Sequence, residues 1–163
     1  YRRAVDLAQD DASYRFRLAQ AYTGHGQNAD ALSAYYADIS LSPGVTEYYA
    51  ARADLFVLLS RQSKAIEDLT QAIELAPGNH DYYTELGEIY YEQENYKEAT
   101  EALTEATNLN PEYAKGLYFL GRAKLALDDI DAAKVAFEAC VKVEGDYQRR
   151  CQEELDMLAT ATP

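Results

Sequence analysis

One stretch of the sequence decides the fold: residues 80–113 read HDYYTELGEIYYEQENYKEATEALTEATNLNPEY. Its small residues and its proline recur elsewhere in the chain at one fixed spacing. The recurring positions are Ala19, Ala53, Gly87 and Gly121, then Ala31, Ala65, Ala99 and Ala133, and then Pro43, Pro77 and Pro111. A fixed period of about 20–50 residues is the sequence signature of a repeat protein, in which units of one kind stack on their neighbours.

The stretch resembles the tetratricopeptide repeat (TPR), a helix-turn-helix unit of about 34 residues. That motif expects large residues at positions 4, 7, 11 and 24, small residues at positions 8, 20 and 27, and proline at position 32. Counted from His80, these positions hold Tyr83, Leu86, Tyr90 and Leu103, then Gly87, Ala99 and Ala106, and then Pro111. The resemblance implies an all-α fold, a TPR α-solenoid in which antiparallel helix pairs stack into a right-handed superhelix.

The same register continues on both sides of this stretch. It predicts the end of a truncated preceding repeat at residues 1–11, complete repeats at 12–45, 46–79, 80–113 and 114–147, and a C-terminal capping helix with a tail at 148–163. An alternative for the last segment is the first helix of a truncated fifth repeat. Because residues 1–11 fit the second half of an earlier repeat, we expect the chain to be a fragment of a longer protein.

Five residues depart from the motif. Arg15 and Arg52 stand at positions for apolar side chains, Asp38 at a position for a small one, Lys124 at a position for an aromatic one, and Gly145 where proline is expected. The sequence does not predict how the side chains pack at these five positions. The expected fold is unchanged.

Composition and charge narrow the classes of partner. The chain has 163 residues, of which 48% are hydrophobic and 26% charged, so it can bury a core. Its formal net charge of −13 disfavours nucleic acid and anionic membrane surfaces, because both are recognised mainly through Lys and Arg. The sequence has no run of about 18 apolar residues, so we expect no direct membrane insertion.

We find no catalytic or metal-binding combination of residues in the sequence. His25 lies in a Gly-His-Gly turn and His80 at the start of a helix, and neither pairs with a carboxylate at metal-ligand spacing. We interpret both as exposed turn histidines. The sequence therefore predicts a protein that is not an enzyme and needs no cofactor and no metal.

Cys140 and Cys151 lie nearly symmetrically about the turn at Gly145 and Asp146, so their side chains can face each other. Two interpretations stay open. The pair forms a disulfide if the protein is in an oxidising compartment, which would favour an extracytoplasmic location. Alternatively, the two cysteines pack as small apolar side chains where two helices meet.

The TPR resemblance also implies where a partner binds, on the concave surface lined by the first helix of each repeat. The residues at the lining positions that we expect to contact a partner are Phe16, Arg17, Gln20, Glu47, Asp54, Asp81, Glu85, Glu88, Tyr91, Glu92, Lys115, Tyr118, Phe119 and Arg122. The four acids from Asp81 to Glu92 recur at i, i+4, i+7 and i+11, so they lie along one side of one helix. Such a groove suits an extended or helical peptide with Lys or Arg and a few apolar anchors.

The function that we expect is a non-catalytic protein–protein interaction module, and two alternatives accompany it. Glu85 and Glu88 can instead form surface ion pairs with the cations of the next repeat, each worth about 0–1 kcal/mol. The chain can also be a structural spacer or a self-associating segment of a larger repeat protein. Light scattering over a concentration series tests self-association, because a strict monomer argues against it.

Some TPR domains bind the C-terminal carboxylate of chaperones through a clamp of Lys, Asn and Arg. At the corresponding positions this chain has residues such as Asp81 and Glu85. Because these carboxylates would repel such a ligand, we expect no binding of chaperone tails in that manner.

Overall fold

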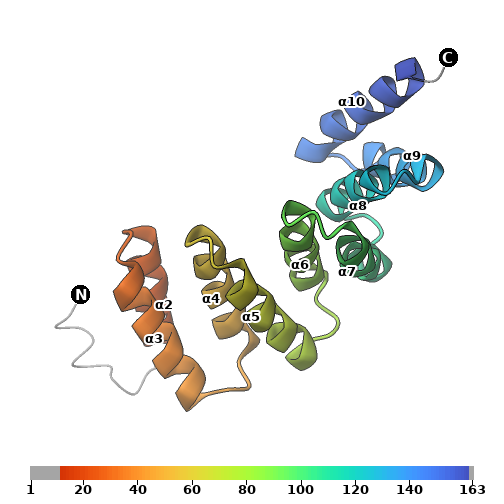
Figure 1. The fold of residues 1–163 in the computed structure, drawn as a ribbon. Coiled ribbons are helices and arrows are strands. Elements are labelled where there is room, and N and C mark those ends of the chain that lie inside the picture. The colour runs from red at the N-terminus through yellow and green to blue at the C-terminus, as the bar shows by residue number, and fades with distance from the viewer. Residues whose placement is uncertain (1–11, 162–163) are drawn as a thin grey trace. The chain divides into compact units, whose positions relative to one another are not determined.

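The computed structural model describes residues 12–161, and within that range it contains helices joined by short turns and no strand. The helices are α2 (Ala12–Gly24), α3 (Asn28–Leu41), α4 (Thr46–Leu58), α5 (Gln62–Leu75), α6 (His80–Glu92), α7 (Tyr96–Leu109), α8 (Ala114–Ala126), α9 (Ile130–Val141) and α10 (Asp146–Ala161). They belong to two compact units, residues 1–77 and 78–163 (Figure 1). The predicted all-α fold is confirmed, whereas the partial repeat predicted at 1–11 lies outside the described residues.

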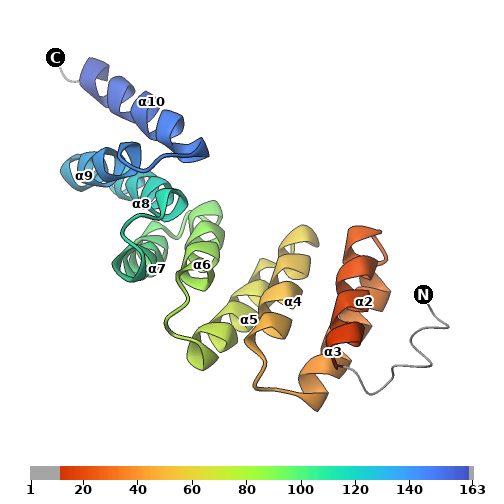
Figure 2. The ribbon, with the colours of Figure 1, turned by 180° about the vertical axis from the view of Figure 1, so that it is seen from behind.

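Antiparallel helix pairs build each unit (Figure 2). In the first unit α2 packs on α3 and α4 packs on α5. In the second unit α6 packs on α7 and α8 packs on α9, and α10 contacts both α9 and α8.

The turn inside each pair has one backbone conformation throughout. A residue with positive φ occupies the same position of every repeat: Gly26 (71°), Ser60 (56°), Glu94 (62°) and Asp128 (59°). The next residue then donates its backbone N–H to a carbonyl five positions earlier, as Asn95 does to Tyr90 at 2.9 Å. This closure satisfies carbonyls at the end of the first helix, and it reverses the chain so that the second helix packs back on the first.

Small residues set the distance between the two helices of a pair. The alanines that the repeat period places there are each 0% exposed: Ala31, Ala65, Ala99 and Ala133. A Cβ at Gly87 would lie 2.5 Å from Leu103 Cγ, and a Cβ at Gly121 would run into the ring of Phe137. Both glycines are therefore needed because the large side chain of the opposite helix occupies the space that a side chain would take.

Two of the departures from the motif are arginines that form ion pairs inside the first unit. Arg15 Nε lies 3.0 Å from Asp38 Oδ1, and Asp38 is fully buried. Arg52 binds Asp68 through two hydrogen bonds, at 2.7 Å from Nε and 2.6 Å from Nη2. Burial acts to lower the pKa of Arg52, but the hydrogen bonds and charge of Asp68 raise it overall. Pairing thus lets charged side chains occupy positions that are apolar in the motif.

Helix α10 departs from the register of the repeats. The repeat period, counted from Ala114, places the next helix at residue 148, but α10 begins earlier, at Asp146. The turn before it contains Gly145 with φ +145°, a conformation that L side chains rarely adopt, at the position where the motif expects proline. A disulfide joins Cys140 of α9 to Cys151 of α10 across a Cα–Cα distance of 6.1 Å, and both cysteines are fully buried. The bond fixes α10 against the preceding pair.

Replacing Gly87 with Ala tests the close approach of α6 and α7. The added methyl group meets Leu103, and overpacking costs about 1–3 kcal/mol, whereas the gain in helix propensity is about 1 kcal/mol. Because the contact with Leu103 Cγ is as short as 2.5 Å, we expect the upper part of that cost and a net fall in the free energy of unfolding, measured in urea, of up to about 2 kcal/mol. In a Leu103→Ala background the same change should cost nothing. Gly44→Ala is the control, because nothing lies within 4 Å of a Cβ there, and equal losses at 44 and 87 would contradict the steric account.

The contribution of the Arg52–Asp68 pair to stability can be tested with the residues that occupy the same positions in the next repeat. Asp68→Ala leaves a buried guanidinium without a counter-ion, and we expect a loss of about 3–5 kcal/mol in the free energy of unfolding. The double variant R52L/D68A copies Leu86 and Ala102, which stand at the same positions of the next repeat. We expect it to unfold within about 1 kcal/mol of the parent chain. If it is as unstable as D68A alone, the missing counter-ion is not the cause.

Removal of the disulfide should lower stability measurably. The bond closes a loop between cysteines separated by 11 in sequence, which corresponds to about 3 kcal/mol of lost unfolded-state entropy. We expect C140A/C151A to melt at a lower temperature than the oxidised chain in calorimetry. A reductant should lower the melting temperature of the parent chain and leave that of the variant unchanged. If the reductant does not change the melting temperature of the parent chain, the disulfide does not contribute to stability as proposed.

Candidate functional site

In the second unit, α8 contacts both α6 and α10. We call the surface built by these three helices the α6–α8–α10 face. It comprises Asp81, Glu85, Glu88, Tyr91 and Glu92 from α6, Lys115, Tyr118, Phe119 and Arg122 from α8, and Tyr147 and Glu154 from α10. The first two groups are the residues that the TPR register predicts for this part of the chain.

Four aromatic rings from the three helices form one cluster on this face. Tyr118 lies with its ring centroid 5.3 Å from Phe119 and 5.3 Å from Tyr147. Phe119 lies 6.1 Å from Tyr91 of α6 and 6.4 Å from Tyr147 of α10. All four residues are half-buried, so each ring packs on its neighbours and keeps part of its surface open to solvent. Aromatic pairs at these distances contribute about 0.5–1.5 kcal/mol beyond their buried area.

Both cations of the face are paired inside the protein. Lys115 Nζ lies 2.5 Å from Glu88 Oε1, which is one of the ion pairs considered in the sequence analysis. Arg122 forms a pair that the sequence analysis did not consider, because its Nη1 lies 3.0 Å from Glu154 Oε1 of α10. The same nitrogen donates to the Tyr118 hydroxyl at 3.2 Å, which links the ion pair to the aromatic cluster.

Burial affects both members of the Lys115–Glu88 pair. It raises the pKa of the Glu88 carboxyl, and the hydrogen bond and charge of Lys115 oppose this shift. It acts to lower the pKa of the Lys115 ammonium, but the hydrogen bond and charge of Glu88 raise that pKa overall. Each group therefore has its charge offset by its partner.

The remaining acids give the face a negative balance. Asp81 and Glu92 are exposed and Glu85 is half-buried, all on α6. Burial, followed by a hydrogen bond to Asp81, raises the pKa of the Tyr113 hydroxyl, so Tyr113 stays a neutral donor beside this carboxylate. The carboxylates are Asp81, Glu85, Glu88, Glu92 and Glu154, and the cations are Lys115 and Arg122. Five negative charges against two positive ones leave an excess of three.

The other predicted contact residues lie in the first unit. Phe16 is half-buried, with its ring centroid 5.0 Å from Tyr48 and 6.1 Å from Tyr35, so it contributes to packing there. The exposed ones are Arg17, Gln20, Glu47 and Asp54. Their role in binding stays a prediction.

Tyr147 and Glu154 are members of the face that the sequence analysis did not identify. The repeat period places residue 147 at the end of a repeat, whereas the structure places it in the first turn of α10. The glycine at 145, in place of the expected proline, was the signal in the sequence that the spacing changes here.

The two histidines differ in their surroundings. His25 is exposed, as expected, but His80 is half-buried, with its ring centroid 4.5 Å from that of Tyr113 and its Nε2 3.1 Å from Asn110 Nδ2. His80 therefore packs against the end of the helix pair. Among residues 12–161 no group of three or more His, Cys, Asp or Glu side chains is arranged to hold a metal ion. None of the helices in this range combines the length and the hydropathy that a bilayer-spanning segment requires.

Comparison with solved structures shows similar folds. The chain superposes on a crystal structure of MamA with a TM-score of 0.79 and 20% identity, over 87% of this chain and 83% of that chain. It superposes on PilF of Pseudomonas aeruginosa with a TM-score of 0.71 and 24% identity, over 82% and 61% of the two chains. The first TPR domain of Spaghetti (RPAP3), bound to the HSP90 peptide SRMEEVD, gives a TM-score of 0.66 at 20% identity, over 71% and 91%.

Comparison of sequences identifies the family. No curated protein sequence matches the chain. Models of the tetratricopeptide repeat match residues 1–45, 46–79, 80–113 and 114–147. The chain therefore belongs to the tetratricopeptide repeat family, whose members are typically non-catalytic protein-interaction modules.

Proposed function

We propose that the α6–α8–α10 face binds a peptide or protein segment that carries Lys or Arg beside apolar anchors. The observation that supports this most is the half-buried aromatic cluster of Tyr91, Tyr118, Phe119 and Tyr147 on a face with excess negative charge. Aromatic rings offer a large apolar contact area at a low cost in conformational entropy. Tyrosine, which supplies three of the four rings, is among the side chains most enriched at the energetic centres of protein interfaces.

The charges of the face favour a basic ligand. Lys115 and Arg122 are offset by Glu88 and Glu154, so an acidic ligand would have to displace a carboxylate from each of them. A basic side chain needs no such displacement and gains from the excess carboxylates along α6. Its cation can also stack on the accessible part of a tyrosine ring, which is worth about 0.5–1 kcal/mol at exposed sites.

The same argument predicts what the face rejects. The peptide SRMEEVD in the RPAP3 structure has three acidic side chains and a terminal carboxylate. Near Asp81 and Glu85 these groups would be repelled. We therefore propose a ligand preference opposite in charge to that of a chaperone-tail clamp.

A pair of peptides that differ in charge tests this proposal. One is SRMEEVD, and the other is Ac-SRMKKVK-amide, which keeps the Met and Val anchors and replaces each acid by lysine. We expect the basic peptide to bind the full chain in isothermal titration and the acidic one to show no measurable binding. We expect E85K/E92K to weaken the basic peptide roughly tenfold or more, because two attractive charges become repulsive.

The control has the same change in net charge elsewhere. E138K/E144K alters two exposed acids near α9 and should leave binding of the basic peptide within about twofold of the parent chain. If both double variants weaken binding equally, the attraction comes from net charge and the proposed face is wrong. Light scattering of the free chain over the same concentrations distinguishes ligand binding from self-association.

A further inference from the structure

Two arginines of the second unit lie over tyrosine rings of the α6–α8–α10 face. The guanidinium carbon of Arg122 lies 5.8 Å from the centroid of the Tyr91 ring. The guanidinium carbon of Arg150 lies 5.1 Å from the centroid of the Tyr147 ring. At both distances the face of an aromatic ring attracts a cation. The α6–α8–α10 face therefore already binds two guanidinium groups of its own chain.

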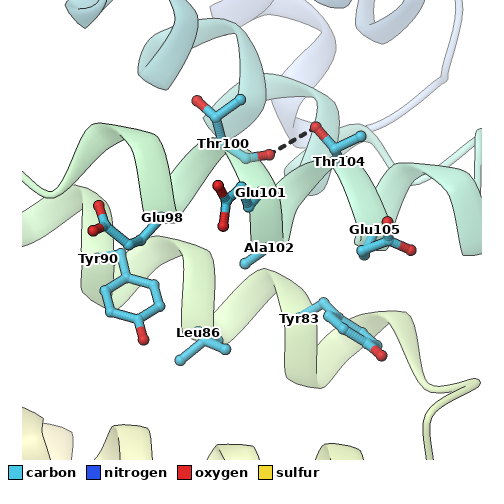
Figure 3. A pocket seen from close by; sticks show the side chains of 9 residues that line it. All are labelled: Tyr83, Leu86, Tyr90, Glu98, Thr100, Glu101, Ala102, Thr104 and Glu105. Carbon is cyan, nitrogen blue, oxygen red and sulfur yellow. Dashed lines mark hydrogen bonds between the residues drawn. The ribbon is translucent and has the colours of Figure 1, made fainter.

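Other tyrosines of the second unit show that nearby carboxylates alone do not produce such a stack. Figure 3 shows Tyr83 and Tyr90 on α6, with Glu98, Glu101 and Glu105 on the neighbouring helix α7. Among the residues that the structure describes, no Lys or Arg side chain lies over either of these two rings. In the described part of this unit, the tyrosines with a guanidinium over the ring all belong to the α6–α8–α10 face.

The two stacked guanidinium groups differ in what else holds them. Arg122 Nη1 also lies 3.0 Å from Glu154 Oε1 and donates to the Tyr118 hydroxyl at 3.2 Å. Arg150 is exposed, and no carboxylate within residues 12–161 forms an ion pair with it. A ligand that displaced Arg122 would have to break a charge-assisted hydrogen bond, whereas a ligand that displaced Arg150 would not. Arg150 is therefore the guanidinium that can leave its ring at low cost.

The contact between Arg150 and Tyr147 is internal to α10. The two residues are three positions apart, so they are neighbours on one side of the helix. Tyr147 is half-buried, with its ring centroid 5.3 Å from that of Tyr118 in the aromatic cluster. The guanidinium thus covers part of a ring that belongs to the binding face, and it does so without help from any other helix.

We propose that Arg150 is an internal competitor of the α6–α8–α10 face, and that a partner binds when one of its arginines replaces Arg150 on the ring of Tyr147. This inference rests on the proposed function, because it concerns how the same face accepts a basic segment. The incoming guanidinium regains the stack that Arg150 gives up. The net gain must then come from the carboxylates of the face and from the apolar anchors of the partner. Arg150 therefore selects against basic segments that lack such anchors.

Arginine suits this exchange better than lysine. Its planar guanidinium stacks on aromatic rings and is more weakly hydrated than the compact ammonium of lysine. The chain itself shows the same preference. Lys115 of this face pairs with Glu88 and, among the described residues, lies over no ring.

Two peptides of equal charge test the preference, Ac-SRMRRVR-amide and Ac-SKMKKVK-amide. Both keep the Met and Val anchors, so they differ only in the kind of cation. In isothermal titration with the full chain we expect the arginine peptide to bind at least about threefold more tightly. Tyr147→Leu keeps an apolar contact and removes the aromatic ring, so it should reduce this advantage to less than about twofold.

A pair of neighbouring variants tests the competition. R150Q removes the competitor and should tighten binding of the arginine peptide about threefold. R149Q is the matched control, because it makes the same change in charge at an exposed residue that pairs with Glu153. Its effect should be less than half of that of R150Q.

NMR follows the exchange directly in the full chain labelled with carbon-13 arginine and assigned with R150K. The ring of Tyr147 shifts the δ-methylene protons of a stacked arginine. We expect the signals of Arg150 to move towards the positions of an unstacked arginine as the arginine peptide is added.

Three results would each overturn the proposal: equal affinities of the two peptides for the parent chain, equal tightening by R150Q and R149Q, or unchanged Arg150 signals while the arginine peptide binds. In each of these cases basic peptides still bind, so the proposed function would stand. If neither peptide binds the parent chain or R150Q, the proposed function and this inference are both wrong.

Discussion

The close approach of the two helices in each pair is the constraint on which the rest of the structure depends. At Gly87 the space that a Cβ would need is occupied by Leu103, and at Gly121 by Phe137. Because the backbones meet there, the large side chains on either side of the crossing point in defined directions. The aromatic and charged residues of the α6–α8–α10 face are positioned by this contact, although they take no part in it.

The requirement for small residues where two helices cross recurs in every repeat. The sequence therefore reveals it as a periodic pattern of small residues. The repeat period predicted the buried alanines, and the resemblance to the tetratricopeptide repeat implied the all-α fold. The positive-φ residue of each turn also recurs at that period. The sequence did not predict this conformation, because the four positions share no side-chain chemistry: they hold Gly26, Ser60, Glu94 and Asp128. The buried ion pair of Arg52 was not predicted, for another reason. Arg52 departs from the motif, but nothing in the sequence indicates that Asp68 is its partner.

The sequence likewise predicted only part of the candidate site. Helical spacing alone placed the acids of α6 on one side, and the register placed Tyr118 and Phe119 on α8. The register could not predict the partner of Arg122, because that partner is Glu154 of a helix that begins ahead of the register. A shift of two positions rotates a helix by more than half a turn, so counting from the previous repeat identifies the wrong side of α10. The disulfide between Cys140 and Cys151 holds the helix in this position.

The repeats at residues 46–79 and 80–113 show that the same backbone accepts two kinds of residue pair at equivalent positions. Arg52 of α4 and Asp68 of α5 form a charged pair, and Leu86 of α6 and Ala102 of α7 stand at the equivalent positions with apolar side chains. A buried pair adds little net stability over a well-packed apolar substitute, so stability hardly constrains the choice. What differs is the local chemistry: the first repeat has a charged pair in which each residue needs the other, and the second has two apolar side chains without that requirement. Variation at positions with little effect on folding is therefore where repeats of the same fold can acquire different partners.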